Sequence, residues 1–434
     1  MRQQVMLGAA VVLSLTIMAS TSSQGADQSV TGAGNQAAQQ LANRSSLVSS
    51  AMALITQRIG QIGDATLRNA TFDAVTNPLT CLAHRARLTE KSKAELLQEL
   101  LAQGLVDPAD EGMFPGGLKA GVYPPVTDEG DACPHLPQPY LAAPGSFFGG
   151  HHSYPGGLAV HSVVNLSSSL SLADNYRKIF GGTAANGLAV IGDGPPAAGK
   201  SAIAIDQDLI IAAPVWHDWA KTIVFQWNED GTEFAELFFG GNGKTDNYGA
   251  AGNSKTGAHH IIGLAESMAR KQSPAFVVTQ ASSHVAPGRG DEFKVVNWIR
   301  AASVIARQDP VVAGYLTKDA RGRLRLPVLR NQGSFDLQRS LPNQSNLLVE
   351  YALHNLSDAD NVFAAPAVVQ AQQLLAMLAP KFGYDPTERA AYNTKYRNPV
   401  LSYLSAERLQ IIYTNAGLDA ERDGEAQGDG DHLS

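Results

Sequence analysis

Histidine side chains are concentrated in the central part of the chain, with aspartates among them. The chain has 11 histidines, and the seven between residues 151 and 284 are His151, His152, His161, His217, His259, His260 and His284. Imidazole nitrogens and carboxylate oxygens together are typical ligands of divalent transition metals. These residue types therefore point to metal chemistry, provided that the fold brings them together.

The segment "DLIIAAPVWHDWAKT" places a histidine directly before an aspartate. A spacing of 4, 3 and 4 residues predicts that one helical face holds Ile210, Pro214, His217 and Lys221. Asp218 lies one position further round, so His217 and Asp218 can reach one ion together. Lys221 lies one turn beyond and can hold a phosphate oxygen, although an ordinary surface lysine has the same spacing. Pro214 is either the first helical residue or the cause of a kink.

Three further residues lie on apolar helical stripes. In "EFKVVNWIRAASVIARQD", Asp309 continues the spacing of Trp298, Ala302 and Ile305, which predicts that its carboxylate faces the interior. Such a carboxylate must be paired or metal-bound. The alternative is a helix-ending Asp that is half in solvent. His161 follows Leu158 by three residues and His260 precedes Leu264 by four. Either one alone is more typical of a core histidine, but several such placements together favour a site.

The segment "GPPAAGKS", residues 194–201, matches the pattern of a nucleotide-binding loop. No apolar strand that ends in a carboxylate pair accompanies it to hold magnesium, and the chain leads from Ser201 straight into the His-Asp helix. We therefore interpret this match as a coincidence and do not expect ATP to bind there.

The first residues are typical of a secretory signal peptide. Arg2 precedes an apolar run from Val5 to Met18, and small residues follow, with cleavage expected after Ala19 or Ala26; a retained anchor is the alternative. No other run of eighteen apolar residues is present, so we expect a secreted or periplasmic protein without an integral membrane segment after cleavage.

The composition narrows the possible partners and the state of the cysteines. The formal net charge is −7, which gives no nucleic-acid signature. For an exported chain the two cysteines, Cys81 and Cys133, favour a disulfide over half of a zinc site.

The chain reads as mainly α. Helical periodicity covers residues 46–105 and resumes at residue 158, whereas residues 106–150 and 322–345 read as loops. Gly-rich stretches at 181–201 and 240–257 interrupt the central helices. The best strand signals are "GLAVIG" at 187–192 and "AFVVTQ" at 275–280.

Taken in order, His161, His217-Asp218 and Asp309 resemble the signature of the HD superfamily of metal-dependent phosphohydrolases. "HHSYPGGLAVHS" is similar to the "HHxYPGGLxxHT" segment of that superfamily, and "HDWAK" to its "HDIGK". "HHIIGLAES" and "SSHVAPG" resemble the intermediate histidine segments of members that bind two metals. The likeness covers about residues 147–315. It departs from the pattern in the Gly-rich insertion before His217, in Val285 where many relatives have a second histidine, and in Pro310.

This resemblance implies an HD-type helical bundle, to which helical periodicity and composition add N- and C-terminal helices and Gly-rich insertions. Composition, helical periodicity and the resemblance together predict a signal peptide at 1–26, an N-terminal helical and loop region at 27–146, an HD-type metal-binding domain at 147–321, a C-terminal helical region at 322–420 and an acidic disordered tail at 421–434.

The resemblance also implies the ligands. His161, His217, Asp218 and Asp309 would surround a first metal, and Asp218 would bridge to a second one held by His260 and His284, with His259 as the alternative to His260. His151 and His152 would line the entrance. One or two divalent ions of Mn, Fe, Ni, Co or Zn are expected.

The implied function is that of an exported phosphohydrolase, in which a metal-bound hydroxide attacks a phosphate ester. Asp218 and Lys221 are the expected catalytic residues. The substrate would be a small-molecule phosphate ester or nucleotide, and the choice between monoester and diester stays open. The alternatives are a non-catalytic HD-fold binding or structural protein and a di-iron HD-type oxygenase.

Overall fold

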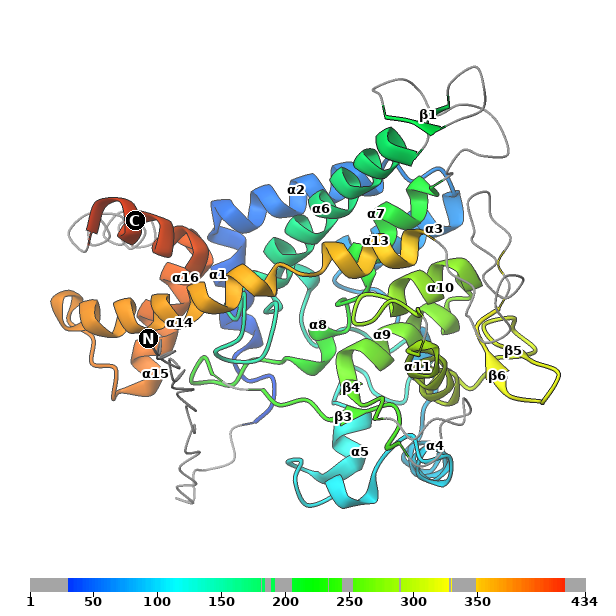
Figure 1. The fold of residues 1–434 in the computed structure, drawn as a ribbon. Coiled ribbons are helices and arrows are strands. Elements are labelled where there is room, and N and C mark those ends of the chain that lie inside the picture. The colour runs from blue at the N-terminus through cyan, green and yellow to red at the C-terminus, as the bar shows by residue number, and fades with distance from the viewer. Residues whose placement is uncertain are drawn as a thin grey trace, which may run out of the picture.

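Figure 1 shows the chain as a computed structural model made mainly of helices, which confirms the mainly α prediction. The structure describes residues 30–180, 182–183, 189–191, 205–232, 234–243, 253–288, 290–327, 329 and 349–417. The predicted signal peptide, the acidic tail and the loop at 194–201 lie outside these residues.

The chain before the central region forms short α-helices. They are α1 (Asn35–Arg44), α2 (Ser46–Ile59), α3 (Ala65–Thr76), α4 (Glu90–Ala102) and α5 (Gly117–Val122). The structure places helices in the predicted span 46–105, and the predicted loop at 106–150 is mostly irregular but contains α5.

Two groups of helices build the central region. The first consists of α6 (Gly157–Phe180), α7 (Gln207–Trp216) and α13 (Val349–Ser357), which pack against one another, and α6 and α7 also contact α2. The second consists of α9 (Ala258–Ala269), α10 (Pro274–Ala281) and α11 (Glu292–Ile305), and α10 also contacts α7 and α13. The short helix α8 (Lys221–Val224) follows α7 after a turn and contacts α9.

The C-terminal helices lie to the left in Figure 1, where they meet the first helices of the chain. They are α14 (Asn361–Leu378), α15 (Arg389–Tyr392), α16 (Asn398–Leu404) and a final helix at 406–417. Contacts of α16 with α1 and α2 join the two ends of the described chain. One helical stretch among the described residues, Val349–Phe382, is long and apolar enough to cross a membrane, and 44% of its most apolar window is buried.

Strands occur as three antiparallel pairs of two residues each within the described residues. They are β1 (Gly182–Thr183) with β2 (Ala189–Val190), β3 (Phe238–Phe239) with β4 (Thr256–Gly257), and β5 (Thr317–Lys318) with β6 (Leu324–Arg325). Of the two predicted strands, "GLAVIG" contributes β2, whereas the strand prediction for "AFVVTQ" is wrong because this segment forms α10. Ser273 caps that helix by accepting from the Phe276 N–H, and Pro274 occupies its first turn.

A buried ionic network ties α9 to an early segment of the chain. The Glu266 carboxylate accepts from the backbone N–H groups of Ala83 and His84, and its Oε2 lies 2.6 Å from His84 Nδ1. Arg270 bonds Glu266 and the Cys81 carbonyl oxygen. Burial alone would raise the pKa of Glu266, but the bond from His84 and the charge of Arg270 hold it at about 2. The helix that carries His259 and His260 is thus fixed by charge-assisted bonds.

The two cysteines form the predicted disulfide. Cys81 and Cys133 are bonded, with their Cα atoms 5.0 Å apart. The bond closes a loop of 52 residues and restricts the unfolded chain.

Candidate metal centre

A tight turn of glycines sets the start of α6 and so places His161. Gly156 has a φ of +89°, and a Cβ there would lie 2.2 Å from Val48 Cγ2. A Cβ on Gly157 would lie 1.8 Å from the His152 carbonyl oxygen. Only glycine fits at these two positions. Since α6 starts at Gly157, His161 falls one turn into the helix, where it is buried.

His217 lies at the end of α7, in a position that fixes its ring. The helix ends at Trp216, and the His217 N–H still donates to the Ala213 carbonyl oxygen. The ring atom Nδ1 lies 3.0 Å from the Pro214 carbonyl oxygen. This bond places the proton on Nδ1 and leaves the Nε2 lone pair available to a metal. Pro214 lies inside the helix, so the alternative that it is the first helical residue is wrong.

Four side chains face one another around the first candidate metal position. The Asp218 atom Oδ2 is 3.0 Å from His161 Nε2 and 3.3 Å from His217 Nε2. The Asp358 atom Oδ1 is 3.2 Å and 3.1 Å from the same two nitrogens. The ligand atoms of His161, His217 and Asp218 all lie within 4.8 Å of one another. The three residues that the sequence placed together are thus brought together, and an unpredicted aspartate joins them.

Asp358 comes from the end of α13, beyond the segment that resembles the HD superfamily. The sequence contained a signal for this residue, because Asp358 continues the 3, 4 spacing of Tyr351 and His354, which are buried on α13. The His354 ring lies 5.1 Å from the His217 ring, measured between centroids. The candidate site therefore includes a residue from the far side of the boundary expected between residues 321 and 322.

The prediction that Asp309 joins this group is wrong. Helix α11 ends at Ile305, and Arg307 adopts a left-handed conformation with a φ of +57°. The Gln308 N–H bonds the Ser303 carbonyl oxygen, which closes the helix end. The helical spacing is therefore interrupted before Asp309. Its carboxylate is exposed and accepts from the N–H groups of Val311 and Val312.

A second group of ligand atoms adjoins the first through Asp218. The other oxygen of this carboxylate, Oδ1, lies 3.3 Å from His259 Nε2. The ligand atoms of Asp218, His259 and His284 all lie within 4.8 Å of one another. The two oxygens of Asp218 thus face different histidines, Oδ2 facing His161 and His217 and Oδ1 facing His259, which is the arrangement that a carboxylate shared by two ions requires.

His259 takes the place that was expected for His260. The His260 ring is buried and stacks on the His284 ring at 4.1 Å, and it does not belong to the second group. Burial lowers the pKa of His260 well below its usual value, and the neighbouring His284 and His259 lower it further, so this ring is neutral. His260 therefore packs behind the candidate ligands.

The four candidate histidines share one hydrogen-bond pattern, in which Nδ1 contacts an acceptor and Nε2 points into the site. The Nδ1 contacts are Asp360 at 3.2 Å for His161, the Pro214 carbonyl at 3.0 Å for His217, Glu236 at 2.6 Å for His259 and the Thr256 hydroxyl at 2.7 Å for His284. Such contacts orient metal-binding histidines and make them more basic. Sequence reasoning missed Asp360, Glu236 and Thr256 as partners, because each is distant from its histidine in sequence.

Buried polar atoms in the site lack hydrogen-bond partners. Within the described residues, His217 Nε2, Asp218 Oδ1 and His259 Nε2 have no partner of proper geometry, although they lie close to other site atoms. An unsatisfied buried polar group is costly, and an ion between these atoms would remove the cost. The chemistry and the placement of these donors fit a divalent transition metal.

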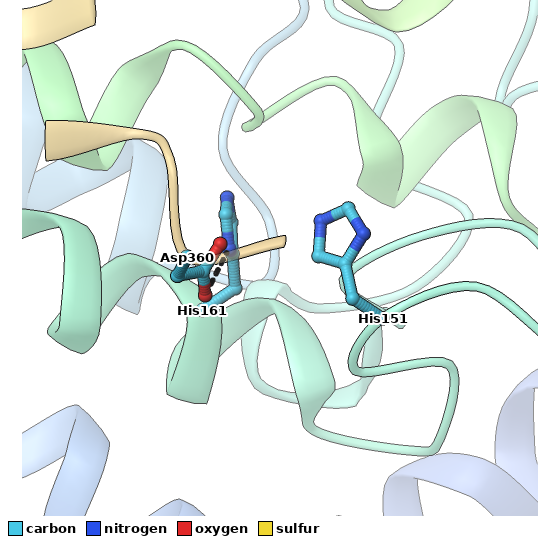
Figure 2. A group of neighbouring side chains, drawn as sticks. All are labelled: His151, His161 and Asp360. Atoms are coloured by element: carbon cyan, nitrogen blue, oxygen red, sulfur yellow. Dashed lines mark hydrogen bonds and ion pairs between the residues drawn. The ribbon is translucent and has the colours of Figure 1, made fainter. Parts of the chain in front are cut away.

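Asp360 and His151 lie on either side of His161 (Figure 2). Asp360 follows α13 and accepts from the rings of both His161 and His152. Although His151, His161 and Asp360 also have ligand atoms within 4.8 Å of one another, the His161–Asp360 hydrogen bond favours an orienting role for Asp360. His151 lines the pocket beside Asp218, as expected, whereas His152 is buried against Asp360.

Lys221 is buried in the site, which excludes an ordinary surface lysine. Its ammonium contacts the Asp218 carboxylate and the Gly145 carbonyl oxygen. The helix is broken between Trp216 and Lys221, yet the predicted closeness of Lys221 to Asp218 holds.

The carboxylates and the histidines polarise one another. Burial alone would raise the pKa of Asp218, but His217 and Lys221 hold it well below its usual range. Burial alone would lower the pKa of His217, but Asp218 and Asp358 raise it to about 9. Asp360 and Asp218 similarly raise the pKa of His161. In the metal-free protein, cationic histidines therefore stand where an ion would bind.

This charge pattern predicts how the metal-free protein responds to pH. The folded-state pKa of His217 is raised, so its contribution to the free energy of unfolding is present below about pH 6.5 and is lost as pH rises through about 9. Metal affinity should change in the opposite sense and increase up to about pH 9, because an ion must displace the His217 proton. Calorimetric metal titrations in two buffers of different ionisation enthalpy would measure the released protons. Equal affinity with no proton release between pH 7 and 9 would contradict this prediction.

The two groups of ligands open into a pocket of about 580 Å³. Its lining includes His151, Lys221, Lys255, Phe147 and Phe238 beside the candidate ligands. Lys255 enters from the loop before β4, and its ammonium lies 2.7 Å from Asp110 Oδ2. The pocket is large enough for a small-molecule substrate.

Comparisons of the chain with family models, with curated proteins and with solved structures found no match. The function must therefore be argued from the site itself.

Proposed function

We propose that this protein is a metal-dependent phosphohydrolase of the HD type with two metal ions that share Asp218. The observation that carries the proposal is the arrangement of Asp218, whose two oxygens face the Nε2 atoms of different histidines. His161, His217 and Asp358 would complete the first position, and His259 and His284 the second. This set differs from the set implied by the sequence likeness in Asp358 and His259.

The metal ions, when bound, would activate a water molecule and offset the charge of the phosphoryl oxygens. The residues of the chain then have separate tasks. Asp360, Glu236 and the Pro214 carbonyl orient the ligand rings. Lys221, which pairs with Asp218, and Lys255, which pairs with Asp110, line the pocket that would receive the phosphate.

The proposal includes export of the protein. The disulfide between Cys81 and Cys133 is compatible with an oxidising compartment outside the cytoplasm. Mass measurement of the N-terminus of the protein recovered from its native cells would test cleavage near Ala19 or Ala26.

Metal analysis of the purified protein together with a panel of phosphate esters tests the proposed activity. We expect two ions per chain and hydrolysis of an ester that stops when the ions are chelated and returns when they are restored. A purified protein that contains no metal and takes up none when metal is supplied would support the non-catalytic alternative. A di-iron protein that is inert towards phosphate esters and consumes oxygen would support the oxygenase.

A Lys221→Met variant separates substrate binding from metal binding. Methionine keeps much of the buried stem and removes the charge. We expect the metal content to stay at two ions per chain, because lysine is not among the ligands, and kcat/KM to fall by about 30- to 150-fold, equivalent to about 2 to 3 kcal/mol for one charge-assisted contact. Metal content and kcat/KM are measured on the same preparation.

The exposed Lys381 offers a control for this experiment, and Lys381→Met should leave both quantities unchanged. Loss of metal in Lys221→Met would mean that Lys221 supports the site structurally. Unchanged values of both quantities would mean that it takes no part in the reaction.

A further inference from the structure

An apolar cavity adjoins the candidate metal pocket. Its volume is about 430 Å³, and it lies between the segment around α5, the loop that contains Phe147 and the chain from Val224 to Glu236. Phe147 and Glu236 line both this cavity and the metal pocket. A molecule bound near Asp218 therefore has a second compartment within reach on the other side of Phe147.

The lining of this cavity suits hydrocarbon. Most lining residues are apolar, and they include the aromatic rings and prolines Phe114, Phe147, Phe148, Phe234, Pro115, Pro124 and Pro125. Among its polar lining residues, Gln226 donates to the carbonyl oxygens of Pro125 and Ile223 and lies 3.4 Å from the Asn35 amide. Glu236 is bonded to His259. Such a surface gains free energy from apolar groups and offers few hydrogen bonds to a sugar or a base.

Packing fixes the walls of the cavity. The guanidinium of Arg397 lies 4.4 Å from the centroid of the Phe148 ring. The Phe234 ring packs against Phe225 at 4.9 Å and against Trp227 at 5.4 Å. Two of its aromatic walls are therefore held in place from behind, which lowers the entropic cost of binding.

We propose that this cavity is a substrate subsite, which binds the apolar alcohol part of a phosphate ester whose phosphate lies at the Asp218 site. This inference rests on the proposed function and adds the substrate class, an ester of a hydrocarbon-rich alcohol. In the reaction, water supplies its oxygen to phosphorus, the bond between phosphorus and the alcohol oxygen breaks, and the alcohol leaves with a proton. The products are inorganic phosphate and the free alcohol for a monoester.

A series of alkyl phosphates from ethyl to octyl tests the subsite, because chain length changes the apolar area while the leaving group keeps a similar reactivity. With the metal-loaded full chain, kcat/KM should rise by about two- to fourfold per methylene until the cavity is filled. An Ala120→Phe variant fills the cavity, since Ala120 lines it away from the metal pocket. It should remove the dependence of kcat/KM on chain length, so that octyl phosphate is hydrolysed no faster than ethyl phosphate.

Phe147→Ala provides a second variant at an exposed position, which folding tolerates more readily. Phe147 and Phe363 are each 55% exposed, and Phe363 lies on α14, outside both cavities, so Phe363→Ala is a matched control. The octyl-to-ethyl ratio of kcat/KM should fall by about 10-fold in Phe147→Ala and stay unchanged in Phe363→Ala.

Calorimetric binding of 1-octanol to the metal-free protein gives a readout that does not depend on turnover. We expect binding to the wild type and none to Ala120→Phe. Hydrolysis that is independent of chain length, without octanol binding, would overturn the subsite and leave the phosphohydrolase standing. Octanol binding without hydrolysis of any ester would instead reject the proposed activity while the apolar site remains.

Discussion

An Asp218→Ala variant is expected to lose nearly all bound metal and all measurable phosphate-ester hydrolysis, while it stays folded. The reason is that one carboxylate serves both candidate metal positions. Its Oδ2 lies 3.0 Å from His161 Nε2, and its Oδ1 lies 3.3 Å from His259 Nε2. Loss of an outer-shell partner typically costs about 10- to 100-fold in metal affinity, and loss of a shared ligand should cost more.

Elemental analysis, hydrolysis rates and the midpoint of thermal unfolding are measured on one preparation of this variant. Asp309→Ala is the matched control, because Asp309 is an aspartate of the same predicted signature that the structure leaves exposed. It should keep the metal content and the activity of the wild type. Full metal content together with full activity in Asp218→Ala would remove the basis of the proposed function.

The sequence predicts part of this site well because some of its ligands are local in sequence. His217 and Asp218 are adjacent, and His161 lies on the apolar side of a helix whose start is set by a recognisable glycine turn. The helical class and the disulfide are also confirmed. In each case, short-range spacing or composition is enough to predict the feature.

The choice between His259 and His260 could not be predicted, because α9 is buried on all sides. Every residue from Ala258 to Met268 is buried, so hydrophobic periodicity does not indicate which face of the helix meets the metal site. Adjacent residues differ by about 100° around a helix axis. The contact between Glu236 and the His259 ring fixes this rotation, and it joins residues that are distant in sequence.

The prediction of Asp309 as a ligand was wrong because hydrophobic periodicity does not show where a helix ends. The helical spacing of apolar residues that begins at Trp298 includes Asp309, but this spacing does not show that the chain leaves the helix at Arg307. The aspartate that does face His161 and His217 follows the polar segment at 322–345 and lies beyond the apparent family likeness. Only tertiary packing of α13 against α6 and α7 brings it to the site.

An Asp358→Ala variant should therefore lose about one metal ion per chain and most of its hydrolytic activity. Asp358 Oδ1 lies 3.2 Å from His161 Nε2 and 3.1 Å from His217 Nε2, so it serves the first position. The second position keeps Asp218, His259 and His284. Partial loss of metal is thus expected here, in contrast to the nearly complete loss expected for Asp218→Ala.

Metal stoichiometry at increasing free metal concentration measures this difference. An Asp358→Asn variant keeps the size of the side chain and one oxygen, so it should bind the first ion more weakly than the wild type but more tightly than Asp358→Ala. Both substitutions also remove the negative charge of Asp358 from beside His161 and His217. The pKa values of these two histidines should therefore be lower in the metal-free variants than in the metal-free wild type. Two tightly bound ions in Asp358→Ala, together with the loss of one ion in Asp309→Ala, would reverse the assignment and return Asp309 to the site.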